Sequence, residues 1–143
     1  MYSIRTLGVV FGIGALAVVG AGPGTASAGA TPHTLRLTAA PLGELQSSNH
    51  DVTAGSDTHN GKATGFDAST CVVNVTTHRA SCDVAVARVH GLIYAHATVS
   101  LSTGQGRGRV TGGTRAYKGA TGTVTLAPGS APKTIQVTLV FHT

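Results

Sequence analysis

Acidic and histidine side chains gather in one polar stretch, "NHDVTAGSDTHN" (residues 49–60). It holds His50, Asp51, Asp57 and His59, which a hairpin would bring close together. Neighbouring carboxyl groups suit general acid or base work, and mixed His and Asp side chains also suit metal binding. A hydrated loop explains the same residues without an ion. We therefore predict no metal site and keep Asp51 and Asp57 as candidate catalytic carboxyls.

A second candidate pair is Tyr94 and His96, in the strictly alternating stretch "HGLIYAHATVSL" (residues 90–101). Side chains two apart on a strand project from one face about 7 Å apart, so the pair could act as acid and base if that face lines a lumen. The commoner arrangement turns the apolar face inward and leaves both side chains exposed. His90 and His96 lie about 20 Å apart along such a strand, too far to bind one ion.

The glycine-rich stretch "RVTGGTRAYKGATGTVTL" (residues 109–126) raises the question of phosphate binding. A phosphate loop continues into a helix N-terminus or ends in Gly-Lys-Ser/Thr, and here Gly119 leads into a Val/Thr-rich strand instead. We therefore predict a structural corner of a sheet, with Tyr117 packed over the adjacent strand. No Gly-x-Ser-x-Gly elbow and no zinc-ligand spacing occurs, so the sequence does not support a hydrolase.

The densest basic cluster lies in and before this stretch and consists of Arg107, Arg109, Arg115 and Lys118. Nucleic-acid binding usually adds stacking aromatics or a much larger charge. We predict a solvated face and no nucleic-acid partner. Attraction to anionic cell-wall polymers or lipid headgroups is the alternative.

The elements that must position all these residues are strands. The chain is rich in Val, Thr, Ala and Gly and has no tryptophan, which is the composition of strands and turns. The clearest strand patterns span residues 34–40, 90–101 and 134–141, and a shorter one spans residues 51–54 before a turn at Asn60-Gly61. Seven or eight short strands at regular spacing favour a sandwich or an up-and-down barrel, and the pattern alone does not choose between them.

Two cysteines, Cys71 and Cys82, stand in "CVVNVTTHRASC", and no others occur. In an exported chain such a pair normally forms a disulfide. If the two face each other across an antiparallel pair, Val73 faces Ala80, and the turn is residues 76–77 or a somewhat wider loop through Arg79. Both arms then direct valines to the side of the disulfide.

The N-terminus has the order of a secretory signal peptide: Arg5, an apolar run over residues 7–20, and small residues ending at Ala28. The apolar run is shorter than the roughly 20 residues of a membrane-spanning helix. We therefore expect a signal peptide over residues 1–28, a flexible leader over 29–33, one domain over 34–143, a secreted product and no membrane span.

The glycine-rich stretch resembles the signature shared by allene oxide cyclases and dirigent proteins, and by small secreted bacterial relatives of both. The matching residues are Gly112, Gly113, Thr114, Tyr117, Gly119, Ala120 and Gly122. The family usually has glycine where this chain has Arg115, so the backbone there must be one that a non-glycine residue can adopt. The resemblance implies an all-β fold, an eight-stranded antiparallel up-and-down barrel of the calycin-like kind.

The resemblance also implies a function, in which the barrel binds or steers a small apolar molecule without a nucleophile or cofactor of its own. The alternatives are an isomerase that closes an epoxide-type lipid with a carboxyl such as Asp51 or Asp57 buried at the barrel mouth, and a solid structural barrel at the cell surface. Because plant members form trimers, a homo-oligomer is expected. The catalytic acids of the plant proteins have no definite counterparts in this sequence, so only the fold carries over.

Overall fold

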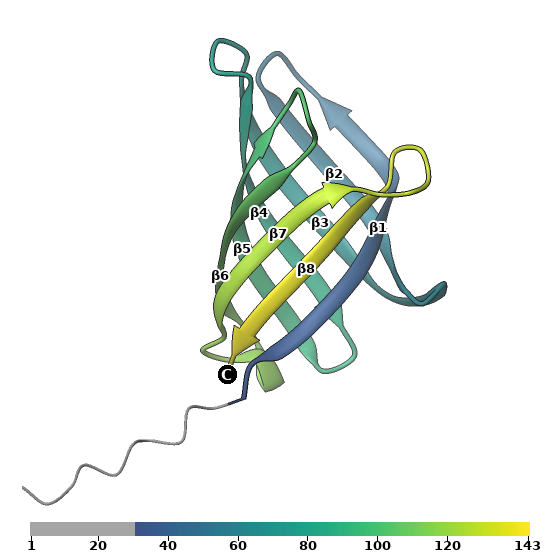
Figure 1. Cartoon of the computed structure of the whole chain (residues 1–143), viewed down its shortest axis with the longest axis vertical. Helices are drawn as coiled ribbons and strands as arrows, with labels where there is room; N and C mark the ends of the chain where they lie inside the picture. Colours follow the sequence, from purple (N-terminus) through teal and green to yellow (C-terminus); the bar gives the residue numbers. More distant parts are fainter. Residues whose placement is uncertain (1–30) are drawn as a thin grey trace, which may run out of the picture.

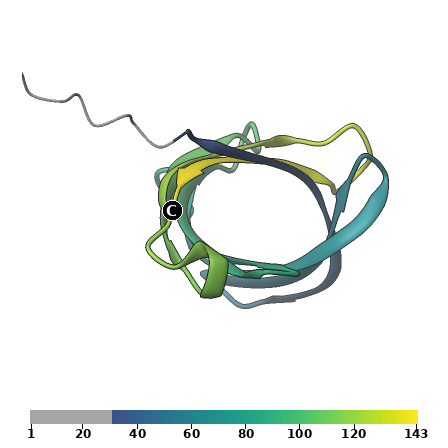
Figure 2. The ribbon, with the colours of Figure 1, turned by 90° about the horizontal axis from the view of Figure 1, so that it is seen from below.

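The computed structural model describes residues 31–143, so the expected signal peptide and its cleavage site lie outside the described residues. Eight strands make up almost all of this part: β1 (His33–Gln46), β2 (His50–His59), β3 (Lys62–Asn74), β4 (Arg79–Arg88), β5 (Gly91–Ser100), β6 (Gly106–Gly113), β7 (Thr121–Pro128) and β8 (Ile135–His142). Each strand pairs antiparallel with the next, and β8 pairs with β1 to close a barrel (Figure 1 and Figure 2). The predicted eight-stranded antiparallel barrel is confirmed.

Alternation along the strands decides which side chains fill the lumen. In β5, Ile93, Ala95 and Ala97 are buried, while the residues between them face outward, as the sequence pattern predicts. The closing strand behaves in the same way, with Leu139 and Phe141 buried. The core formed by these side chains consists of Leu37, Val86, Ile93, Ala95, Ala97, Val110, Ala120, Val124, Val137, Leu139 and Phe141.

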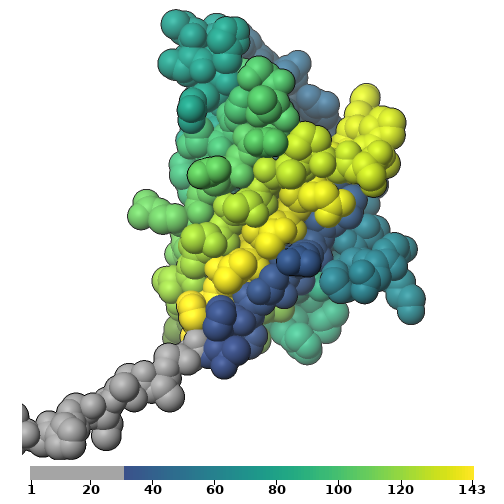
Figure 3. Space-filling view, viewed as in Figure 1, coloured from purple at the N-terminus to yellow at the C-terminus, as the bar shows by residue number. Residues whose placement is uncertain are grey.

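The two ends of the barrel differ. The lower end in Figure 1 carries the chain terminus at Thr143, the β2–β3 turn and a short 3-10 helix, η1 (Arg115–Tyr117). Tyr117 of this helix packs edge-on against Phe141, with 5.9 Å between the ring centroids. The other end carries the β1–β2, β3–β4, β5–β6 and β7–β8 loops. Strands β7, β8 and β1 lie side by side on the face seen in Figure 3.

Strands β1 and β2 are longer than the sequence pattern predicts. The predicted turn chemistry after residue 54 is in fact strand as far as His59, and only Asn60-Gly61 turns, with φ angles of 51° and 74°. The reason is that β2 pairs along its whole length with β3 and over most of it with β1, and this pairing outweighs a polar composition. Strand β1 likewise continues to Gln46 through a register shift between Pro41 and Gly43.

The β3–β4 hairpin has the predicted register. Cys71 pairs with Cys82 and forms the disulfide, and Val73 pairs with Ala80. The pairing ends at Asn74 and Arg79, so residues 75–78 connect the strands, a loop wider than residues 76–77 that ends before Arg79.

The glycine-rich stretch forms the corner between β6 and β7, and η1 lies within it. Gly113 has no room for a side chain, because a methyl group there would overlap the backbone oxygens of Tyr117 and Leu92. Arg115 has a φ of 52°, in the left-handed region that favours glycine. The backbone at Arg115 therefore has a conformation that is energetically unfavourable for a residue with a side chain. Within residues 31–143 no helix is long and apolar enough to cross a membrane.

Candidate ligand site in the barrel lumen

A cavity of about 370 Å³ occupies the end of the lumen that carries the β3–β4 loop. One part of its wall is apolar and includes Val73, Val84, Val99, Leu126 and Val137. The disulfide belongs to this wall, because Cys71 and Cys82 both line the cavity. The sulfur atoms and valines follow from the alternation on β3 and β4, which turns every second residue inward.

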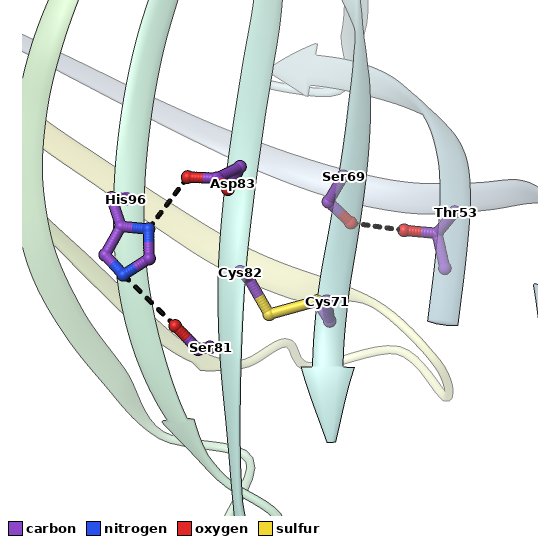
Figure 4. The surroundings of a disulfide bond; sticks show 7 residues. All are labelled: Thr53, Ser69, Cys71, Ser81, Cys82, Asp83 and His96. Atoms are coloured by element: carbon purple, nitrogen blue, oxygen red, sulfur yellow. Dashed lines mark hydrogen bonds and ion pairs between the residues drawn. A yellow bond between two sulfur atoms is a disulfide. The ribbon is translucent and has the colours of Figure 1, made fainter. Parts of the chain in front are cut away.

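The polar part of the wall comes from β2 and from the part of β3 that precedes the disulfide. Asp51 and Thr53 project into the cavity from β2, and Asp67 and Ser69 project from β3. The hydroxyl groups of Thr53 and Ser69 share a hydrogen bond of 2.6 Å across the two strands (Figure 4). A bound molecule would therefore meet an apolar surface on one side and carboxyl groups on the other.

The position of the Asp67 carboxyl depends on a glycine. Gly55 is the register partner of Asp67 on β2, and a methyl group at position 55 would overlap the Asp67 Oδ1 atom. Without a side chain at 55, the carboxyl group lies across β2 on the lumen side. The absence of a side chain at Gly55 thus leaves the space that the Asp67 carboxyl group occupies.

A second cavity, of about 260 Å³, meets the first at Asp67. The two share Ala39, Thr53, Asp67 and Ile135, and the second is also lined by Glu44 and Lys133. It forms because β8 pairs with β1 only as far as Ala39, after which β1 continues with β2 as its one neighbour. Asp67 can therefore be approached from the end of the barrel and from its side.

Asp57 lies deeper in the lumen, and its side chain is only 1% exposed. Neither of its carboxyl oxygens has a hydrogen-bond partner among residues 31–143, and one oxygen each of Asp51 and Asp67 is also buried and unpaired there. The pKa of Asp57 is raised to about 6, first by burial and then by the nearby Asp67 carboxyl, while the Arg88 guanidinium opposes the shift. Arg88 itself donates a hydrogen bond of 2.7 Å to the Thr64 hydroxyl.

Burial also raises the pKa of Asp67, against the lowering effect of a hydrogen bond from its own backbone. A carboxyl with a raised pKa holds its proton closer to neutral pH than a free one does, which suits acid or base work. Asp67 lines both cavities, whereas Asp57 lies behind it. The chemistry available to this site is thus hydrogen bonding, charge and proton transfer at carboxyl groups.

Of the sequence candidates, Asp51 lies at the cavity and Asp57 beneath it, and their catalytic roles stay predictions. Asp67, Gly55 and Arg88 were missed. The signal for Asp67 was available, because it stands four residues before Cys71 and must share the face of the disulfide. Gly55 stands two residues before Asp57 and shares its face in the same way.

Tyr94 and His96 do not reach the lumen, so the commoner of the two predicted arrangements is the one observed and the alternative, an acid–base pair facing the lumen, is wrong. The apolar face of β5 turns inward, so both side chains lie outside. His96 pairs through Nδ1 with Asp83 at 2.8 Å and through Nε2 with the Ser81 hydroxyl at 3.1 Å (Figure 4). The His96 and Asp83 side chains are 48% and 83% exposed.

This outer Ser–His–Asp chain has the atom order of a hydrolase triad but lacks the rest of such a site. Strands β4 and β5 are paired on both sides, so their backbone N–H groups are engaged in the sheet. A hydrolase needs free donors for the oxyanion and a place from which water is excluded. The cluster is a polar feature of the outer surface.

The basic residues Arg107 and Arg109 are also exposed, on the outer face of β6. Within the described part of the chain, no three His, Cys, Asp or Glu side chains come close enough to hold a metal ion. The absence of a nucleic-acid partner and of a metal stay predictions.

The fold and the lumen define this protein as a small closed antiparallel β-barrel whose lumen contains a cavity. Among 24 solved chains that match it is one described as pyocyanin demethylase, with a TM-score of 0.62 and 19% sequence identity over 77% of this chain and 100% of that chain. At this identity the likeness shows the fold alone. No family model matches the sequence, and no curated protein matches it.

Proposed function

We propose that this protein is a secreted barrel that binds a small, largely apolar molecule in the open end of its lumen and holds it in one orientation. The observation that carries the proposal is the cavity of about 370 Å³ with valines and a disulfide on one side and carboxyl and hydroxyl groups on the other. Pockets that bind small molecules commonly have this volume, mostly apolar walls and a few polar groups that orient the ligand.

The resemblance to allene oxide cyclases and dirigent proteins supports a steering role. A dirigent protein orients a reactive species made by another enzyme, and orientation requires a shaped cavity more than reactive side chains. The structural neighbour's name says that it demethylates pyocyanin, which is consistent with a barrel of this fold that holds a small molecule. A solid, purely structural barrel would have its lumen filled by side chains and would leave no such cavity.

Export is part of the proposal and rests on two observations. The N-terminal segment has the order of a signal peptide, and Cys71 and Cys82 form a disulfide, which persists in oxidising compartments. Mass spectrometry of the protein recovered from its native host would test both, with an N-terminus at Gly29 and a mass two hydrogens below the reduced form as the expected result.

The binding role is tested by titrating the protein with a panel of terpene-sized and bicyclic aromatic molecules, followed by calorimetry and native mass spectrometry. We expect at least one member to bind with one molecule per barrel. If no member of the panel binds at millimolar concentration, the proposal is wrong.

A second candidate function is an isomerase for an epoxide-type lipid, and the observation that favours it is the Asp67 carboxyl, which lines both cavities and whose pKa is raised by burial. Such a group can lend a proton to an opening epoxide oxygen and recover it as the ring closes. The test is the stereochemistry of the cyclised product. An isomerase yields one enantiomer in excess, and Asp67→Asn abolishes that excess; a racemic product with the native protein would rule the isomerase out.

A further inference from the structure

The lumen and the outer surface of this protein have opposite charge. The whole chain carries a formal net charge of +5, yet the cavity presents Asp51 and Asp67, and Asp57 lies beneath them. The positive group of Arg88 lies near Asp57, donates to the Thr64 hydroxyl and lines a separate cavity at the other end of the barrel. Glu44 and Lys133 both line the side cavity, so this opening carries one negative and one positive side chain.

The carboxyl groups of the lumen lack partners. Asp57 is 1% exposed and neither of its oxygens is hydrogen-bonded within residues 31–143, and one buried oxygen of Asp51 and one of Asp67 are also unpaired. Buried polar atoms are nearly always paired, because an unpaired one forfeits its hydration without compensation. An ionised carboxylate is an acceptor only, so what these groups lack is a donor.

Building on the proposed function, we propose that the lumen selects organic cations: molecules with an apolar body and a protonated amine or similar charged nitrogen, which the carboxylates of Asp67 and Asp51 receive. The apolar wall of Val73, Val84 and Val99 takes the body of the molecule, and the polar wall takes its charge.

Asp67 is the expected centre of recognition. It lies where the end cavity and the side cavity meet, so a molecule that enters by either opening reaches it. Because Gly55 has no side chain, the Asp67 carboxyl group can lie close against β2. The cavity beside the carboxyl group then has space for a bound nitrogen. An alcohol offers a carboxylate a hydrogen bond alone, whereas a cation adds Coulomb attraction to the hydrogen bond, so a cation gains more here than an alcohol of the same shape.

The test uses three probes that share one ring system and differ in charge: 2-naphthylmethylamine, 2-naphthalenemethanol and 2-naphthoate. Binding of each to the native protein is measured by calorimetry at low salt and about pH 7.5, above the pKa of about 6 of Asp57. We expect the amine to bind at least about tenfold more tightly than the alcohol and the naphthoate to bind most weakly.

Two variants assign the preference to the lumen. Asp67→Asn keeps the shape of the side chain and removes its charge, and it should lower the preference for the amine over the alcohol by about tenfold. Asp83→Asn makes the same change on the outer face, where the side chain is 83% exposed, and should leave the preference as it is. If Asp67→Asn does not fold, Asp51→Asn takes its place in the comparison.

The outcomes separate this inference from the proposed function. If the alcohol or the naphthoate binds as tightly as the amine, or if the preference is unchanged in Asp67→Asn, the selection of cations is wrong while a binding role stands. If none of the three probes nor any member of the wider panel binds, the proposed function fails and this inference fails with it.

Discussion

Asp57 is buried near the Asp67 carboxyl and the Arg88 guanidinium, and burial makes its ionised form unfavourable. Its pKa is about 6 in the fold against an ordinary value of 3.8. Because the folded value is the higher one, the fold binds the proton more tightly than the unfolded chain does. The stabilisation from this proton is complete below about pH 3.8 and is lost as the pH rises through about 6.

The Asp57→Asn variant isolates this effect, because asparagine does not titrate. Relative to the variant, we expect the native protein to lose stability between about pH 4 and pH 7, by up to about 3 kcal/mol in free energy of unfolding. Urea denaturation of both proteins across this range measures the difference. A difference that does not change with pH, or that changes in the opposite direction, would contradict the placement of Asp57.

Gly55 is the second residue whose role can be measured alone. Gly55→Ala places a methyl group against the Asp67 carboxyl and should lower the free energy of unfolding by about 1 to 3 kcal/mol. Much of this loss should disappear when Asp67 is also replaced by alanine, which a double-mutant cycle detects.

Gly43→Ala is the matched control for Gly55→Ala, because a methyl group at position 43 meets no atom within 4 Å. It should change stability little. Equal losses at positions 55 and 43 would show that the contact with Asp67 is unimportant.

Among the structural elements, the β3–β4 hairpin combines a structural and a functional part. The disulfide joins its two strands across a sequence separation of 11 residues and also forms part of the cavity wall. By the chain-entropy model a loop of this length contributes about 2 to 3 kcal/mol. The hairpin therefore stabilises the end of the barrel that holds the candidate site.

Replacing both cysteines with alanine should lower the free energy of unfolding by about that amount, 2 to 3 kcal/mol. Thermal and urea unfolding measure the loss. A reducing agent should lower the stability of the native protein in the same way and leave the variant unchanged. A reductant that affects both proteins equally would show that the loss has another origin.

The corner between β6 and β7 contains one residue, Arg115, whose backbone conformation is unfavourable for any amino acid except glycine. Arg115 has a φ of 52°, and the left-handed region costs a non-glycine residue about 1 to 2 kcal/mol. Arg115→Gly should raise the free energy of unfolding by about 0.5 to 1 kcal/mol, since the greater flexibility of unfolded glycine cancels part of the gain.

Lys118→Gly is the control, because Lys118 has a φ of −59° and gains nothing from glycine. It should lose about 0.5 to 1 kcal/mol. If both substitutions destabilise the protein equally, the left-handed backbone at Arg115 carries no cost.

Sequence patterns predict the strands with apolar alternation well and the polar ones poorly. The inward faces of β5 and β8 and the register of Cys71 with Cys82 follow from alternation, which depends on local geometry alone. Strand β2 is polar and looked like a turn after residue 54, because its strand character comes from pairing with neighbours that are distant in sequence. That error placed Asp57 in a hydrated loop, although it is buried, and left Asp67 without a role.

The whole molecule is a barrel with a packed core and with hollows at both ends, since a cavity of about 350 Å³ lies beside Arg88, Tyr117 and Phe141 at the end opposite the candidate site. Apolar side chains from all strands except β2 and β3 form the core, and the polar inner faces of β2 and β3 line the part that the core does not fill. The outer surface retains exposed apolar side chains, such as Phe66 and Tyr94. The homo-oligomer expected from the resemblance stays a prediction, which light scattering after size-exclusion chromatography checks: a mass above one chain supports it and a single-chain mass contradicts it.

The central claim, that the open lumen end binds a small molecule, is tested most directly by filling it. Val84 lines the cavity and its neighbour Ala85 faces outward, so Val84→Trp and Ala85→Trp add the same ring inside and outside the barrel. The measurement is calorimetric binding of 2-naphthalenemethanol to the native protein and both variants. We predict that Val84→Trp weakens binding at least about tenfold while Ala85→Trp leaves it unchanged. Binding that survives unchanged in Val84→Trp, or that weakens equally in Ala85→Trp, would contradict the claim.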